Sequence, residues 1–314
     1  MSGRRLGAII RPACRVPPQQ APVSPAVAQL PLRAAVASPA PSMSDTSHRI
    51  PDDLKGVWQR TLLQQGADSG TPQTDRTTWA RRLLTGEWFV DMRLPAHCLE
   101  ARRAAPLTDL RVSELTALVD QQAHAGIVRF EHLAEGPLCT WLRRIDFQPP
   151  GLTPDAGWLL AQSPDELLEI GVHVDHNEVW QRLPDSGGRH VALAGFHDDG
   201  LDNGRRLLVA GQHIALVRAR SKPWPRGMAA GTTLREVLIH QPQHVLDWLD
   251  CSVAFGRIEP GCCVVERSTL PEEEGARLPL RVERLDAHSA HVRLGDDEVE
   301  WRVLEWQGPA LIHA

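Results

Sequence analysis

The chain of 314 residues contains no tyrosine and only two lysines, Lys55 and Lys222, among its 34 lysines and arginines. The arginines are spread along the whole chain, so we interpret this skew as codon bias rather than as an arginine-rich binding surface. Residues 1–44 hold five arginines and no acid, so the net charge of −5 becomes −10 for the rest of the chain. An acidic body repels phosphate backbones, and we expect no nucleic-acid partner.

Long hydrophobic runs are also missing. No stretch reaches the roughly 18 consecutive apolar residues that a membrane helix needs, so we expect no membrane partner. There is no C-x-x-C pair, and the cysteines are expected to be small buried hydrophobes in a reducing, cytoplasmic compartment rather than metal ligands or disulfides. They are Cys14, Cys98, Cys139, Cys251, Cys262 and Cys263.

Catalytic signatures are absent as well. The chain has no G-x-S-x-G motif and no glycine cluster that would hold a phosphate between a strand and a helix. His240 and His244 have the i, i+4 spacing of zinc ligands, but Pro242 lies between them and no glutamate follows His240. We therefore expect no cofactor and no metal, and we favour a non-catalytic protein over an enzyme.

The first 44 residues differ from the rest in composition. They contain eight prolines, abundant alanine and no apolar periodicity, so we expect a disordered tail. Met43 opens a segment that is typical of a natural start. We interpret residues 1–42 as a mis-set start codon, and the alternative is a targeting tail that mimics a transit peptide.

From Leu54 onward the chain consists mainly of short strands separated by turn residues. Helical spacing occurs at 112–122 and again at 232–250, where Pro242 interrupts it. The turn-rich segment 184–188 is the best domain boundary. We predict a first barrel over 45–185, a second over 186–308 and a C-terminal tail over 309–314.

The two halves repeat the order strand, strand, helix, strand, strand and a terminal meander. Three residue pairs recur at almost the same separation: Phe130 with Phe255, Cys139 with Cys263, and Trp180 with Trp301. We predict a mainly β fold with a few helices, a tandem duplication of two antiparallel β-barrels. Barrels of eight to ten strands either pack solid or hold one small ligand.

Four segments carry a family resemblance: GVWQRTLL, the strand ending DMRLP, LRRIDFQPPG and EIGVHVDHNEVWQRL. Together they resemble the Hri proteins of fungi and their bacterial relatives, over about Leu54 to Trp306. The resemblance implies paired calycin-like (lipocalin-like) barrels of unestablished function and supplies no catalytic residues. The family commonly has an aromatic residue where this chain has His176.

Period-two spacing places Trp88, Val90 and Met92 on one face of a strand, and Cys139, Trp141 and Arg143 on one face of another. If these faces turn inward, Trp141 forms an aromatic wall with an arginine at the mouth of the first barrel. The competing interpretation is that the tryptophans fill the core. On a strand, His173 and Asp175 share one face while His176 points to the other, so the three cannot converge on a metal without a bend.

We therefore expect the first barrel, rather than the second, to bind a small apolar or amphipathic ligand. The alternatives are a structural or protein-interaction module with solid barrels and an uncharacterised enzyme that uses residues of the first barrel. The candidate ligand-binding residues are Arg93, Trp141, Arg143, Asp146, Glu169, His176, Glu178 and Trp180.

Overall fold

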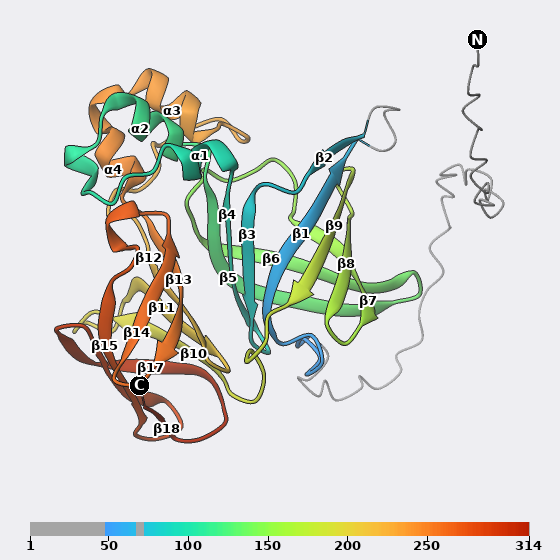
Figure 1. Cartoon of the computed structure of the whole chain (residues 1–314), viewed down its shortest axis with the longest axis vertical. Coiled ribbons are helices and arrows are strands. Elements are labelled where there is room, and N and C mark those ends of the chain that lie inside the picture. The colour runs from blue at the N-terminus through green and yellow to red at the C-terminus, as the bar shows by residue number, and fades with distance from the viewer. Residues whose placement is uncertain (1–47, 67–71, 314) are drawn as a thin grey trace, which may run out of the picture. The chain divides into compact units, whose positions relative to one another are not determined.

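Two closed, eight-stranded antiparallel β-barrels follow each other along the chain in the computed structural model, which describes residues 48–66 and 72–313 (Figure 1). The predicted mainly β fold with tandem antiparallel barrels is confirmed. The expected tail of residues 1–44, with Met43 and Cys14, lies outside the described residues.

In the first barrel each strand pairs with the next along the chain, and the last strand closes on the first. A short strand, β2 (Gln73–Asp75), adds to the far end of β1. The barrel strands are β1 (Gly56–Gln65), β3 (Trp79–Leu84), β4 (Trp88–Leu94), β5 (Gln122–Leu133), β6 (Gly136–Asp146), β7 (Ala156–Ser163), β8 (Glu166–Gly171) and β9 (His176–Arg182).

The second barrel has the same order of pairing, and β17 closes on β10. The expected C-terminal tail contains β18 (Leu311–His313), which pairs with β15. The barrel strands are β10 (His190–Phe196), β11 (Asp202–Ala210), β12 (His213–Arg218), β13 (Ser252–Glu259), β14 (Cys262–Ser268), β15 (Arg277–Arg284), β16 (Ser289–Leu294) and β17 (Asp297–Gln307).

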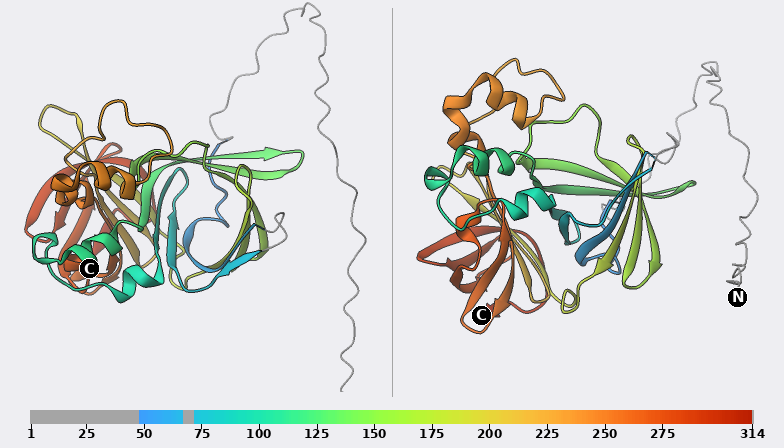
Figure 2. Two further views of the ribbon diagram at one scale, coloured as in Figure 1. Left: turned by 90° about the horizontal axis from the view of Figure 1, so that it is seen from above. Right: turned by 45° about the horizontal axis from the view of Figure 1, so that its top comes forward.

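Helices interrupt both barrels at the same place, between the third and fourth barrel strands. In Figures 1 and 2 they gather at one end of the barrels, which we call the helix end. The first group is α1 (Ala96–Glu100), η2 (Leu107–Asp109) and α2 (Val112–Leu118); the second is α3 (Leu234–His240), η3 (Pro242–His244) and α4 (Val245–Leu249). Thr233 begins α3 by accepting a hydrogen bond from the Glu236 N–H, and Pro242 ends the α-helical ladder as expected.

One β-bulge occurs in the equivalent hairpin of each barrel and fixes the true correspondence of the halves. Gly126 on β5 and Gly256 on β13 both flank a register shift, and a Cβ atom at either position would lie 2.1 or 2.2 Å from a backbone oxygen of the next strand. These two glycines are 130 positions apart, so Phe255 corresponds to Ala125 and not to Phe130. The duplicated strand order was predicted correctly, but this residue pairing was wrong.

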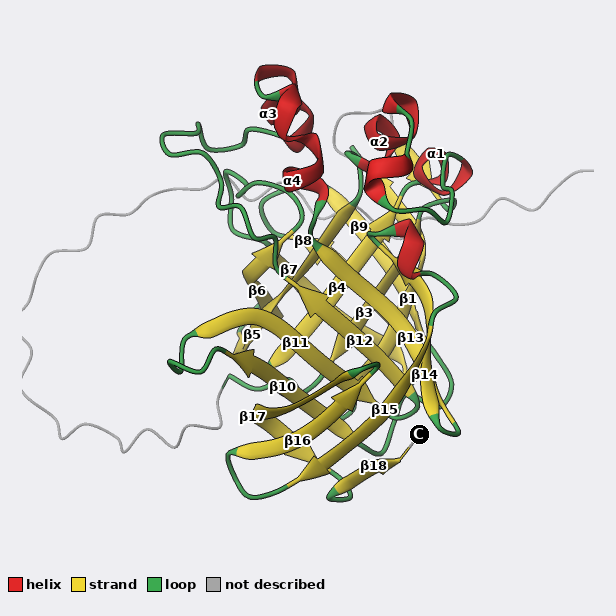
Figure 3. Cartoon of the chain, turned by 90° about the vertical axis from the view of Figure 1, so that its left-hand side faces the viewer, coloured by secondary structure: helices red, strands yellow, loops and turns green. Residues whose placement is uncertain are grey.

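The apolar core has three parts. One lies inside each barrel, and the largest lies outside both, where β3–β5, α2 and η2 pack with β10–β13 and the helices α3 and α4. Figure 3 shows the helices of both groups at the upper end of the strands. Trp88, Val90 and Met92 belong to the shared core, so the expectation that they turn inward is wrong: the outer face of β4 is buried too, and Phe89, Asp91 and Arg93 point inward.

Polar contacts also join the barrels. Glu305 of β17 accepts hydrogen bonds from the Gly86 N–H (2.7 Å), the Glu87 N–H (3.1 Å) and the Thr85 hydroxyl (2.7 Å), which fixes the β3–β4 turn. Arg81 of β3 pairs with Glu266 of β14. All five described cysteines are buried and unpaired, as expected. Among the described residues, no helix has the length and apolar character to cross a membrane.

Candidate ligand-binding site at the mouth of the first barrel

The inner face of the first barrel has two zones. The zone toward the β3–β4 turn is apolar and contains Trp58, Leu84, Phe89 and Phe130. The zone toward the helix end is lined by three arginines and three carboxylates, which we call the charge cluster. Its members are Arg60, Arg82, Asp91, Arg93, Glu169 and Glu178.

Each carboxylate of the charge cluster contacts at least one guanidinium. Arg82 donates to Asp91 (Nε–Oδ2, 2.9 Å) and to Glu169 (Nη1–Oε2, 2.6 Å). Arg93 donates to Asp91 and, at 2.8 Å, to Glu178, which also accepts from Arg60 at 2.7 Å. The cluster is thus a continuous and electrically balanced network across the barrel.

Aromatic rings flank the buried guanidinium groups. The Arg82 guanidinium lies 4.1 Å from the ring centroid of Trp141 and 4.3 Å from that of Trp180. The Trp141 Nε1–H donates to Glu169 at 3.2 Å. The Nε1 atom of Trp180 is buried and has no hydrogen-bond partner among the described residues, so one donor of this zone is unsatisfied.

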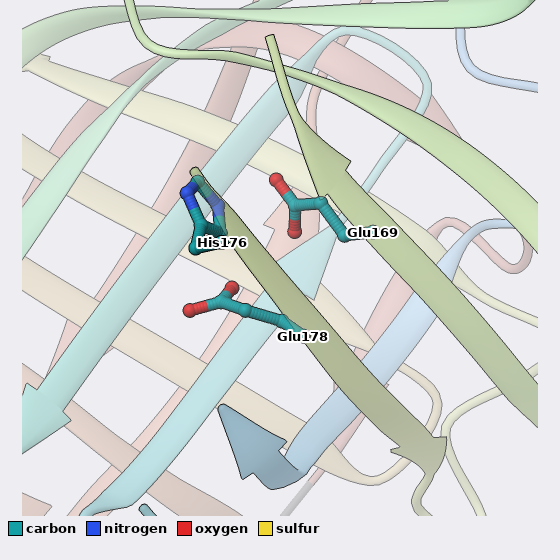
Figure 4. A group of neighbouring side chains, drawn as sticks. All are labelled: Glu169, His176 and Glu178. Carbon is teal, nitrogen blue, oxygen red and sulfur yellow. The ribbon is translucent and has the colours of Figure 1, made fainter. Parts of the chain in front are cut away.

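His176 joins the cluster from the open end of the barrel. It lies beside Glu169 and Glu178, and one ligand atom from each of the three residues lies within 4.8 Å of the others (Figure 4). Gly171 makes room for the imidazole, because a Cβ there would lie 2.4 Å from His176 Cε1. Both carboxylates already face guanidinium groups, and this disfavours a cation at the three side chains.

Burial and charge act against each other on the pKa values of the cluster. Burial raises the pKa of Glu169; Arg82 opposes the shift and Glu178 reinforces it. Burial would also raise the pKa of Asp91, but Arg93 and Arg82 hold it well below its usual range. His124 lies against Phe89 and inside the barrel, where burial and then Arg143 lower its pKa to about 3. His124 is therefore neutral at pH 7.

The second barrel provides an internal comparison for these charges. Arg82 pairs with Asp91 across the β3–β4 hairpin. At the same distance from the turn of the β11–β12 hairpin, Leu207 pairs with Leu216. Leu207 lies in the apolar interior of the second barrel, and Leu216 packs against it. The same architecture therefore folds with leucines where the first barrel has an ion pair.

A cleft of about 620 Å³ opens beside the charge cluster at the helix end, and we call it the mouth cleft. Its walls come from β6, from the loop that joins β6 to β7, from the β8–β9 connection and from the segment that joins β12 to α3. The lining includes Trp141, Leu142, Arg143, Arg144, Asp146, Pro150, Gly151, Thr153, Pro154, Asp155, Val174 and Trp224.

Two acids of this cleft share one arginine. Arg143 donates to Asp155 (Nη2–Oδ2, 2.6 Å) and to Asp146 (Nη1–Oδ2, 3.1 Å). Asp146 also accepts from the Gln148 N–H at 3.0 Å, so it holds the start of the proline loop. Burial raises the pKa of Asp146 to about 6 although Arg143 lowers it, whereas Arg143 holds the pKa of Asp155 below its usual range against the effect of burial.

Arg144 is the extra residue of the first barrel's β-bulge, since Gly126 pairs with Arg143 and Ala125 with Ile145. Its exposed guanidinium lines the mouth cleft and has no ion-pair or hydrogen-bond partner among the residues that the structure describes. Glu266 occupies the equivalent position of the second barrel and pairs with Arg81. The bulge thus directs an unpaired cation into the cleft.

The structure separates the residues predicted for ligand binding into two groups. Arg93, Glu169, Glu178, Trp180 and His176 lie inside the first barrel or at its opening. Arg143 and Asp146 lie in the mouth cleft, and Trp141 belongs to both places. Cys139 and Trp141 share the inward face of β6 as predicted, while the bulge displaces Arg143 to the rim of the barrel.

Five residues of this region were not among the predicted ligand-binding residues: Arg60, Arg82, Asp91, His124 and Arg144. The first three alternate with apolar residues on their strands, a pattern that also fits a solvated face. Their shared signal is that charged residues recur at inward spacing on five strands of one half, whereas the matching hairpin of the other half has Leu207 and Leu216 in place of Arg82 and Asp91. Comparison of the chain with protein-family models, with curated proteins and with solved structures finds no match.

Proposed function

We propose that the protein binds a small amphipathic anion in the mouth cleft of the first barrel and acts as a binding protein rather than as a catalyst. The observation that carries the proposal is the unpaired Arg144 guanidinium, which a β-bulge directs into a cleft of about 620 Å³. Cavities of roughly 300–1,000 Å³ with a few placed polar groups are typical of small-molecule sites.

The charge cluster supports a role other than folding. Buried ion pairs lose much of their Coulomb energy to desolvation, and apolar residues of similar volume often replace them without loss of stability. The second barrel has Leu207 and Leu216 where the first has Arg82 and Asp91. A buried ion pair that one barrel retains at these positions, where the other has leucines, is consistent with a ligand that needs it.

The chemistry of the cleft indicates the ligand class. Trp141, Val174 and Trp224 offer apolar and aromatic surface, and Arg144 offers planar donors that match a carboxylate. Arg143 is held by Asp155 and Asp146, and the pKa of about 6 means that Asp146 becomes neutral just below physiological pH. Arg143 can then turn one donor toward an anion, so binding should strengthen as the pH falls through 6.

Calorimetric titration with 2-naphthoate, a planar aromatic carboxylate, tests this proposal. We expect one binding event in the full chain, with affinity reduced about tenfold or more in Arg144→Gln because a charge-assisted hydrogen bond contributes about 1.5–3 kcal/mol. The neutral analogue 2-naphthol should bind more weakly than 2-naphthoate.

Arg129→Gln is the matched control, because Arg129 is an arginine of the same barrel that pairs with Glu131 outside the cleft. Its affinity for 2-naphthoate should equal that of the unmutated chain. Absence of binding, or equal affinity in the two variants, would refute the assignment of the cleft. The segments GVWQRTLL and LRRIDFQPPG also lead us to propose membership of the Hri family, whose paired barrels agree with this architecture.

A further inference from the structure

The second barrel is open at its helix end into a pocket of about 360 Å³. Seven of its eight strands, β11 to β17, contribute lining residues, so the pocket is the mouth of the barrel interior itself. This volume lies within the usual range for small-molecule sites.

The floor of this pocket is apolar. It consists of one aromatic side chain and five aliphatic ones that converge from different strands, namely Leu216, Ala254, Val265, Leu278, Leu294 and Trp301. An apolar floor inside a barrel favours a compact hydrocarbon group, because such a group loses water contact on entry. The inner zone at the same end of the first barrel is charged, so the two barrels differ in the ligand that they suit.

Arginines line one side of the pocket. Arg205 of β11 pairs directly with Arg218 of β12 across the strands, and both line the opening. Like charges directly opposite each other on a sheet destabilise it. Each has a carboxylate partner that is itself more than a third exposed: Asp297 lies 2.9 Å from Arg205 and Asp250 lies 2.7 Å from Arg218. Exposed pairs of this kind contribute little and exchange readily.

A third arginine adds to this side. Arg206 is only 6 % exposed, lines the same pocket, and its Nε atom has no hydrogen-bond partner among the described residues. Glu272 and Glu273 face the pocket from η4 (Pro271–Glu273), and the hydroxyls of Ser252 and Ser268 donate to Glu273. Arg205, Arg206 and Arg218 thus line a pocket with an apolar floor, and the guanidinium of Arg206 is itself held by Asp202.

We propose that the second barrel binds a medium-chain carboxylate, with its hydrocarbon chain against Trp301 and Leu278 and its carboxylate between Arg205 and Arg218. The anion relieves the repulsion between the two guanidinium groups, and the chain fills the apolar mouth. This site is separate from the mouth cleft and does not depend on the function proposed there.

Calorimetric titration of the full chain with decanoate tests the inference. We expect 1:1 binding that weakens at least tenfold in Arg205→Gln and in Arg218→Gln. We also expect at least tenfold weaker binding of decanol, which has the same chain without the charge. Circular dichroism and urea unfolding check that each variant keeps its fold, and both arginines lie at the surface end of their strands.

Two controls separate this site from the mouth cleft. Arg281→Gln changes an exposed arginine of β15 that pairs with Glu283, and it should leave decanoate affinity unchanged. Arg144→Gln should leave decanoate binding intact while it weakens 2-naphthoate. The inference is overturned if decanoate does not bind, if decanol binds equally well, or if Arg205→Gln and Arg218→Gln bind decanoate like the unmutated chain.

Discussion

The buried imidazole of His124 should make the stability of the protein depend on pH in a way that one substitution removes. Burial and the Arg143 charge lower the pKa of His124 from 6.5 to about 3 in the folded chain. Between these two values the unfolded chain binds more protons than the folded chain. The contribution of His124 to stability is therefore complete above pH 6.5 and is lost as the pH falls toward 3.

The size of the loss follows from the shift. One pKa unit corresponds to about 1.36 kcal/mol, so the free energy of unfolding should fall by roughly 2.5 kcal/mol between pH 7.5 and pH 4.5 through His124 alone. His124→Gln keeps a polar side chain but cannot titrate. The difference in the free energy of unfolding between the variant and the unmutated chain should therefore shift by that amount in favour of the variant between pH 7.5 and pH 4.5. This holds whatever the difference is at pH 7.5.

Urea unfolding followed by tryptophan fluorescence at pH 7.5, 6.0 and 4.5 measures this difference. Asp146, whose raised pKa favours the folded state as the pH falls toward 4, contributes in both proteins and cancels from the comparison. His132→Gln, an exposed histidine of the same strand, is the control and should show no pH-dependent difference. Parallel loss of stability in His124→Gln and the unmutated chain would show that His124 is not held neutral.

Three further substitutions test the packing around the site, all by urea unfolding. Arg82→Leu should lower the free energy of unfolding by roughly 3–5 kcal/mol because Asp91 and Glu169 lose a buried partner. Adding Asp91→Leu copies the leucine pair of the second barrel and should recover at least half of that loss. Losses that simply add in the double variant would contradict this reasoning. Glu305→Ala should cost about 2–3 kcal/mol through its lost hydrogen bonds to the β3–β4 turn, unlike Glu300→Ala on the exposed part of β17. Gly126→Ala should cost about 1–3 kcal/mol because its Cβ would lie 2.1 Å from the Leu142 oxygen, whereas Gly187→Ala, with open space around it, should be neutral.

The strand order could be predicted because turn residues punctuate the chain and because the helical period occurs once in each half at the same place. The face of β4 that points into the barrel could not be predicted from the sequence. Asp91 and Met92 are both fully buried, one inside the barrel and the other in the core between the barrels. Period-two alternation distinguishes the two faces of a strand only where one of them is exposed to water, and both faces of β4 are buried.

Strand alternation also identified only part of the candidate site. Trp141, Glu169 and Glu178 could be selected because polar and aromatic residues alternate on their strands. Arg144 could not, because the bulge at Gly126 shifts the alternation by one residue and turns an ordinary strand arginine into the cleft. A bulge depends on how two strands pair, and a single strand's sequence does not record it.

Native mass spectrometry of the protein purified from its own host is the most direct test of the mouth cleft. The unmutated chain and Arg205→Gln should both retain a small molecule that gas-phase activation releases as an anion. Arg144→Gln should appear without that additional mass. A bare mass for the unmutated chain, or the same retained molecule in Arg144→Gln, would contradict the proposed binding function.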